Sequence, residues 1–200
     1  MQPQALSTTM ALLDGLLEPG NEAVWREFDA RYRPIVFAFA RKLGLDESDA
    51  ADVAQEAMLR FVQEYRAGKY DRERGRLRSW IIGIVKYRVA DVQRSKAKRR
   101  EYRGESAFVG LPEDDQLAEL WEAERRRMLL RQALAELREQ TKTNEKTIRA
   151  FELYAIHEQP VADVACELGL TTHDVYVAKS NVAARLREIL TRLEQVFDDG

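Results

Sequence analysis

The sequence predicts an all-α protein with two small helical domains joined by an acidic linker. Apolar residues recur at helical spacing along nearly the whole chain, no stretch alternates as a strand does, and Gly, Pro and acidic residues gather near the middle. The 200 residues suffice for one or two domains. We expect domains over residues 1–103 and 127–200, with the linker over 104–126.

In the N-terminal half, breakers and capping residues separate the helical patterns. Gly44 can end a long helix that is bent at Pro34, Asp46 or Ser48 can cap the next helix, and Ser79 can cap the last one. The expected helices span residues 8–17, 22–43, 46–67 and 79–100. A polar loop over 68–78 precedes the last of them.

In the C-terminal half, residues 116–138 and 144–156 suit one helix each, and two short helices follow. The stretch "PVADVACELGLTTHDVYVAKSNVAARLREIL", residues 160–190, has the punctuation of a helix-turn-helix. Pro160 suits a first helical turn, Gly169 a left-handed turn, and Thr171 or Thr172 an N-cap. The second helix of such a motif enters the DNA major groove, whereas a plain helical hairpin would serve protein contacts.

That second helix has two distinct faces. Its core stripe consists of Val175, Ala178, Val182, Leu186 and Ile189. At about 100° per residue, the opposite face consists of His173, Tyr176, Val177, Ser180 and Ala184. We expect the second set to face DNA.

Composition argues against several classes of protein. No apolar run reaches the ~20 residues that span a membrane, so we expect no membrane insertion, and the N-terminus lacks the order of a signal peptide. A single cysteine, Cys166, which we expect in the core, favours a cytoplasmic location, and with two histidines it argues against a zinc site. No nucleophile, phosphate loop or metal cluster indicates an enzyme, and we expect no cofactor and no catalytic residue.

The net charge of −2 conceals a strong segregation of charge. Residues 60–103 contain 15 Lys/Arg against 5 Asp/Glu, whereas residues 104–124 contain 7 acids and no base. Local potential governs attraction to a polyanion, so the basic segment is a candidate DNA surface and the acidic linker balances it.

The segment "DESDAADVAQEAMLRFVQEY", residues 46–65, has an apolar and a polar face. The predicted buried side consists of Val53, Ala54, Ala57, Met58, Phe61 and Tyr65. The other side carries Asp52, Glu56, Leu59 and Gln63, with Gln55 at its edge. An acidic face is usually only solvated, but a leucine exposed among acids would be explained by a protein partner.

The basic loop and the helix after it can form a coherent DNA site. Cations there would hold the backbone, and the rings of Tyr70, Trp80 and Tyr87 could stack on unpaired bases. The alternative for Trp80 is ordinary core packing beside Ile81 and Ile84, and the residue alone favours that alternative.

These motifs together resemble the extracytoplasmic-function (ECF) group of sigma factors, the promoter-recognition subunits of bacterial RNA polymerase. "DAADVAQEAMLRF" resembles the family's polymerase-binding helix, and "GRLRSWIIGIVKYRVADVQR" resembles its minus-ten segment. "VADVACELGLTTHDVYVAKSNVAARLR" resembles the motif that reads the minus-thirty-five element. The resemblance covers about residues 8–103 and 127–192, so it implies a region 2 domain and a region 4 domain joined by the linker.

The resemblance implies a function and a set of partners. The chain would bind core RNA polymerase, at the β′ clamp helices and the β flap, and direct it to promoter DNA; many relatives also have an anti-sigma factor. The polymerase-binding residues would be Asp52, Gln55, Glu56, Leu59 and Gln63. The minus-ten residues would be Lys69, Tyr70, Arg76, Arg78, Ser79, Trp80, Lys86, Tyr87, Arg88, Arg94, Lys96 and Lys98. The minus-thirty-five residues would be Thr172, His173, Tyr176, Val177, Lys179, Ser180, Asn181 and Arg185.

The sequence departs from the family pattern at a few positions. Leu77 replaces the usual Phe, Tyr87 the usual Asn, and Asn181 a common Arg. Asn pairs with adenine where Arg favours guanine, so we expect a shifted upstream element. The alternative function is a helix-turn-helix regulator with a helical dimerisation domain and no stable polymerase contact.

Overall fold

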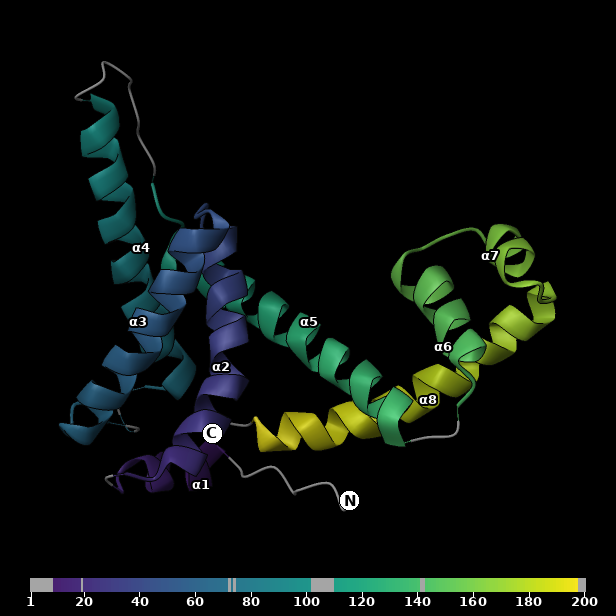
Figure 1. The fold of residues 1–200 in the computed structure, drawn as a ribbon, viewed down its shortest axis with the longest axis horizontal. Coiled ribbons are helices and arrows are strands. Elements are labelled where there is room, and N and C mark those ends of the chain that lie inside the picture. The colour runs from purple at the N-terminus through teal and green to yellow at the C-terminus, as the bar shows by residue number, and fades with distance from the viewer. Residues whose placement is uncertain are drawn as a thin grey trace. The chain divides into compact units, whose positions relative to one another are not determined.

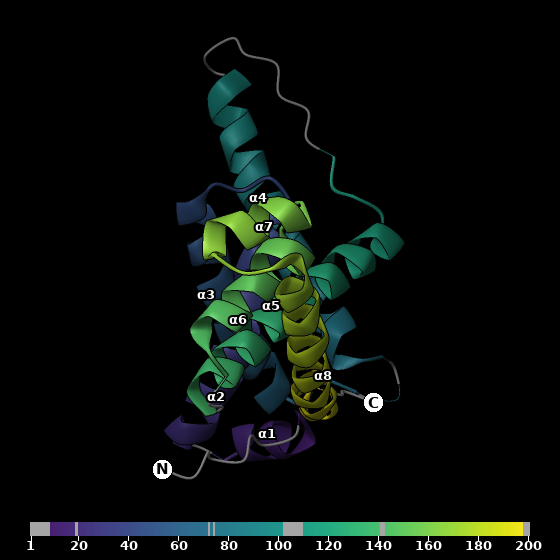
Figure 2. The same ribbon diagram turned by 90° about the vertical axis from the view of Figure 1, so that its right-hand side faces the viewer.

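The computed structural model describes residues 9–18, 20–71, 73, 75–101, 110–140 and 143–197, and every regular element within these ranges is helical (Figures 1 and 2). The predicted all-α class is therefore confirmed. The chain divides into an N-terminal unit, Met1–Met128 with Val196–Gly200, and a C-terminal unit, Leu129–Gln195. Thr8, the loop residues Arg72 and Arg74, and linker residues 104–109 lie outside the described residues.

The N-terminal unit is built on three long helices packed in chain order, since α2 contacts α3 and α3 contacts α4 (Figure 1). Its elements are α1 (Thr9–Leu16), α2 (Glu22–Lys42), α3 (Glu47–Arg66), α4 (Leu77–Glu101) and the first half of α5 (Asp114–Gln140). Phe28 of α2 stacks on Phe61 of α3 with ring centroids 4.9 Å apart. Ile81 and Val85 of α4 are also buried.

Local signals in the sequence set the helix ends in this unit. Asn21 and Asp46 are N-caps, since their side chains accept hydrogen bonds from the amides of Val24 (3.2 Å) and Asp49 (2.9 Å). Gly44 adopts a φ of 90° just after α2, as its predicted capping role requires. Pro34 lies inside α2.

One helix boundary in the N-terminal prediction is wrong. Helix α4 begins at Leu77 rather than at Ser79. The Leu77 side chain is buried, and its packing stabilises a helix that starts two residues earlier. Helix α5 contains the helix predicted over residues 116–138, and its first turns lie within the range 104–126 that was predicted as the acidic linker. Leu117 and Trp121 are fully buried one turn apart, and the Trp121 ring meets Phe39 of α2 edge-on at 5.6 Å.

The C-terminal unit is a small helical domain around one core. Its elements are the second half of α5, α6 (Glu145–Phe151), the π-helical turn η1 (Glu152–Ile156), α7 (Val161–Leu168) and α8 (Thr172–Val196). Its core contains Ala150, Leu153, Val164, Ala165, Val175 and Ala178. Gly169 ends α7 with a φ of 56°, and the half-buried Leu170 packs against the core, as expected for a helix-turn-helix.

Three expectations for this unit need correction. Cys166 is exposed, since it points away from the α7 face that buries Val164 and Ala165. The last helix is 25 residues long rather than short, because the stripe predicted from Val175 continues to a buried Leu193. The predicted helix 144–156 ends in the π-helical turn η1. No helix in the described ranges is long and apolar enough to cross a membrane.

Candidate nucleic-acid and protein interfaces

Helix α3 presents the predicted polar stripe to solvent. We call Asp52, Gln55, Glu56, Leu59 and Gln63 the α3 stripe, and all five are exposed. Leu59 is 47% exposed, whereas Phe61 on the other side of the helix is fully buried. The helical period therefore separates a core face from a face with one uncovered leucine, as predicted.

Residues from α4 and from the loop between α3 and α4 extend this surface. Arg88 of α4 pairs with Glu56 at 3.3 Å, which brings a residue assigned to the DNA set beside the α3 stripe. A hollow of about 460 Å³ lies here. It is lined by Glu56, Leu59, Arg60, Gln63, Glu64, Lys69 and Arg88. The α3 stripe thus borders a depression that carries both signs of charge.

Tyr70, in the loop before α4, belongs to a cluster of aromatic rings. Tyr70 stacks on Trp80 with centroids 5.0 Å apart and planes 8° apart, and the Trp80 ring meets Phe61 edge-on at 5.2 Å. Trp80 is half-buried, so it both belongs to the core and reaches the surface. A pocket of about 220 Å³ lies beside this pair. It is lined by Lys69, Tyr70, Asp71, Gly75, Arg76, Ser79 and Trp80.

The basic face of α4 is largely ion-paired. Lys86 meets Asp114 at 2.7 Å, and Arg78 meets Glu122 at 2.8 Å, so the acidic start of α5 neutralises two predicted DNA cations. Within α4, Arg94 pairs with Asp91.

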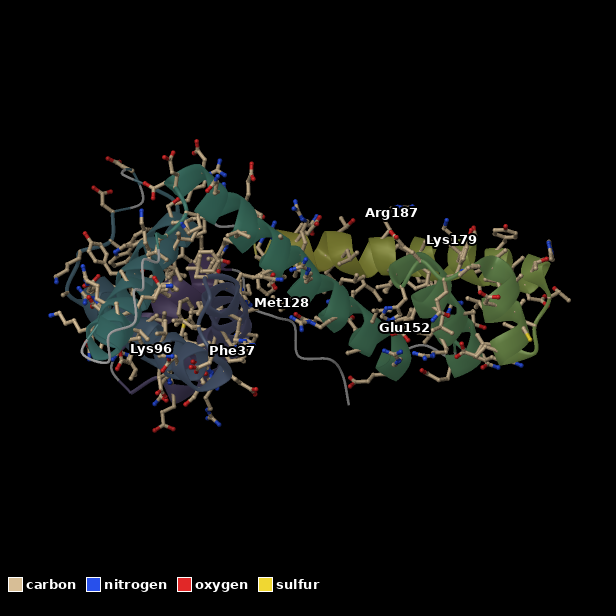
Figure 3. The ribbon with its side chains drawn as sticks, turned by 90° about the horizontal axis from the view of Figure 1, so that it is seen from above. Phe37, Lys96, Met128, Glu152, Lys179 and Arg187 are labelled. Atoms are coloured by element: carbon tan, nitrogen blue, oxygen red, sulfur yellow. The ribbon has the colours of Figure 1, made fainter. Side chains whose placement is uncertain are left out.

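Lys96 occupies a different environment from the rest of the basic face. Its ammonium pairs with Asp46 and Asp49 at the N-terminus of α3 (Lys96 is labelled in Figure 3). Hydrogen bonds to these two carboxylates raise the pKa of Lys96 above its ordinary value. Lys98 and Tyr87 are exposed on α4, and the Tyr87 side chain is 71% accessible.

The C-terminal unit presents all eight predicted minus-thirty-five residues to solvent from α8. Thr171 caps this helix: its hydroxyl accepts from the Asp174 amide at 3.1 Å, and its amide donates to the Asp174 carboxylate at 3.0 Å. The hydrogen bonds from Thr171 lower the pKa of Asp174. Arg185 is hydrogen-bonded to Thr143.

Tyr154 contacts two of these residues, and no sequence pattern singled it out. Its ring meets Tyr176 edge-on at 5.6 Å and lies 5.2 Å beneath the Lys179 ammonium. An aromatic residue near the end of a predicted helix was the available signal. The π-helical turn that carries the ring was not predictable from spacing.

Comparison with known proteins shows which family the chain resembles. Residues 28–99, from α2 to near the end of α4, match the model of sigma-70 region 2. The chain is 27% identical over 186 residues to the ECF RNA polymerase sigma factor RpoE of Cereibacter sphaeroides, covering 93% of each protein. The chain therefore contains a match to sigma-70 region 2 and is similar to an ECF sigma factor along nearly its whole length.

The residues matched to sigma-70 region 2 include the α3 stripe, the Tyr70–Trp80 pair and the basic face of α4. A solved structure of CnrH in complex with the cytosolic domain of CnrY is also similar. It is 20% identical, has a TM-score of 0.37, and the match covers 90% of this chain and 96% of that one.

Proposed function

We propose that this sigma factor binds core RNA polymerase through the α3 stripe and directs it to promoters through α4 and α8. The observation that carries the proposal is the exposed Leu59 among acids, on a helix inside the region 2 match. Exposure of the leucine side chain to water is unfavourable in free energy, and burial by a partner would remove that cost. The clamp helices of the β′ subunit are the expected partner of this stripe.

Two surfaces of region 2 are suited to the minus-ten element. The pocket beside Tyr70 and Trp80 offers aromatic rings and the exposed Arg76, which suits an unpaired base and its phosphate. The α4 cations Lys86, Arg94 and Lys98 suit the DNA backbone beside it. Both surfaces lie within residues 1–103, the proposed region 2 domain.

The C-terminal domain, proposed over residues 127–200, reads the minus-thirty-five element. The cap at Thr171 and the turn at Gly169 orient the first turns of α8, and Tyr176, Ser180 and Asn181 lie on its exposed face. This domain also contacts the β flap. An anti-sigma factor would act most directly by covering the α3 stripe.

The test is a binding measurement with core polymerase. Leu59→Asp places a charge where the partner must desolvate the surface, so we expect the dissociation constant to rise at least about tenfold. Leu17→Asp is the matched control, because Leu17 is 52% exposed and lies outside the α3 stripe. Both variants should keep the helical circular dichroism of the wild type. Equal retention of Leu59→Asp and wild type on immobilised polymerase would refute the assignment.

A further inference from the structure

Tyr154 contacts two side chains of α8, the helix proposed to read the minus-thirty-five element. Its ring is nearly perpendicular to that of Tyr176, with an interplanar angle of 84° and centroids 5.6 Å apart. The same ring lies 5.2 Å from the Lys179 ammonium. Tyr176 and Lys179 are three residues apart on α8, so they project from one face of the helix, and both remain exposed.

The backbone of Tyr154 is held firmly by its neighbours. The preceding Leu153 is buried in the core with Val164 and Val175. The turn itself is closed by a hydrogen bond from the His157 amide to the Glu152 carbonyl at 2.9 Å. The Glu152 carboxylate in turn accepts from Arg138 at 2.7 Å (Glu152 and Lys179 are labelled in Figure 3). The ring therefore projects from an anchored π-helical turn, a feature that often marks functional sites.

We propose that Tyr154 is a positioning residue for recognition of the minus-thirty-five element, the upstream one of the two promoter elements. It acts through Tyr176 and Lys179, and this inference rests on the proposed function of α8. Free Tyr and Lys side chains would lose rotamer freedom on binding DNA. Contact with a fixed ring removes part of that loss beforehand and directs both groups toward the same base pairs.

The experiment selects a randomised minus-thirty-five element with holoenzymes that carry Tyr154→Leu, Tyr154→Phe, Tyr176→Ala or Lys179→Ala. Leucine keeps apolar bulk but removes the ring. The preference of the Tyr154→Leu holoenzyme for the selected element over random DNA should therefore fall roughly 3- to 10-fold. Phenylalanine keeps both ring contacts and should stay within about twofold of wild type. The base pairs at which Tyr154→Leu loses its preference should be the same ones at which Tyr176→Ala loses it.

The outcomes separate this inference from the proposed function. If Tyr176→Ala and Lys179→Ala leave the selected motif unchanged, α8 does not read this element and the proposed function of the domain fails. If those variants change the motif while Tyr154→Leu matches wild type, the role of Tyr154 is refuted. A Tyr154→Leu holoenzyme with a lower melting temperature and an unchanged motif would also refute it, because the role would be structural only. In a Tyr176→Ala background, Tyr154→Leu should cause a smaller further loss of preference, and full additivity would contradict the coupling.

Discussion

Thr171 and Asp174 define the start of α8 through reciprocal hydrogen bonds, and the neighbouring Thr172 does not take part in them. The sequence left the choice between the two threonines open, because either residue could precede the helix. Gly169 and Leu170 determine which threonine is the N-cap, because the turn at Gly169 and the packing of Leu170 against the core fix the start of α8. A similar local competition placed Cys166 outside the core while Ala165 took the buried position.

Thr171→Ala should destabilise the C-terminal domain by about 1 kcal/mol, because the Asp174 amide loses its acceptor. Thr172→Ala, one residue later, should leave stability near that of the wild type. Thermal unfolding followed by circular dichroism measures both variants. Equal loss in the two would contradict the cap assignment.

The same pair of residues predicts a pH dependence. The Asp174 pKa lies below the ordinary 3.8, chiefly because the Thr171 hydroxyl donates to the carboxylate. The ionised form therefore stabilises the fold, and its contribution is complete above pH 3.8 and lost as the pH falls through the lowered pKa. The gap in melting temperature between wild type and Thr171→Ala should accordingly narrow in acid, and a constant gap down to pH 2 would contradict this account.

At the scale of elements, α5 agrees with the helix predicted over residues 116–138, but its first turns lie in the range predicted as the acidic linker. Acids dominate residues 113–124, and that composition indicates a solvated linker. The structure uses those acids differently: Leu117 and Trp121 face the core, while Asp114 and Glu122 reach α4 cations. Apolar spacing predicted the helix from residue 116, but the charge of its first turns obscured their packing against α2. Helix α3 was predictable because its buried positions recur from Ala50 to Val62, over more than three turns.

Release of the α4 cations should strengthen DNA binding. Asp114→Asn removes the partner of Lys86, and a surface ion pair of roughly 0.5–1 kcal/mol no longer opposes the phosphate contact. Promoter affinity of the holoenzyme should rise about 2- to 5-fold. Asp115→Asn removes the same charge at the next residue without freeing Lys86. Equal gains in both variants, measured by fluorescence anisotropy, would show that only net charge matters.

At the scale of the whole molecule, the all-α class, the punctuation of the helix-turn-helix and the exposed α3 stripe were predictable from sequence. Each depends on helical periodicity or on a glycine with a required conformation, which are local properties. The pairing of α4 cations with α5, the Tyr70–Trp80 stack and the Tyr154 contacts were not predictable. They join residues that the chain separates by 10 to 44 positions, so only packing brings them together.

The most direct test of the account is run-off transcription with core polymerase and genomic promoter fragments. The wild-type chain and Leu17→Asp should each yield transcripts of defined length, because the α3 stripe is intact in both. With this chain at a concentration well below the wild-type dissociation constant, Leu59→Asp should yield at most about a tenth of that product, since its dissociation constant is expected to be at least about tenfold higher. Full-length product with Leu59→Asp, or no promoter-specific product with the wild type, would contradict the account.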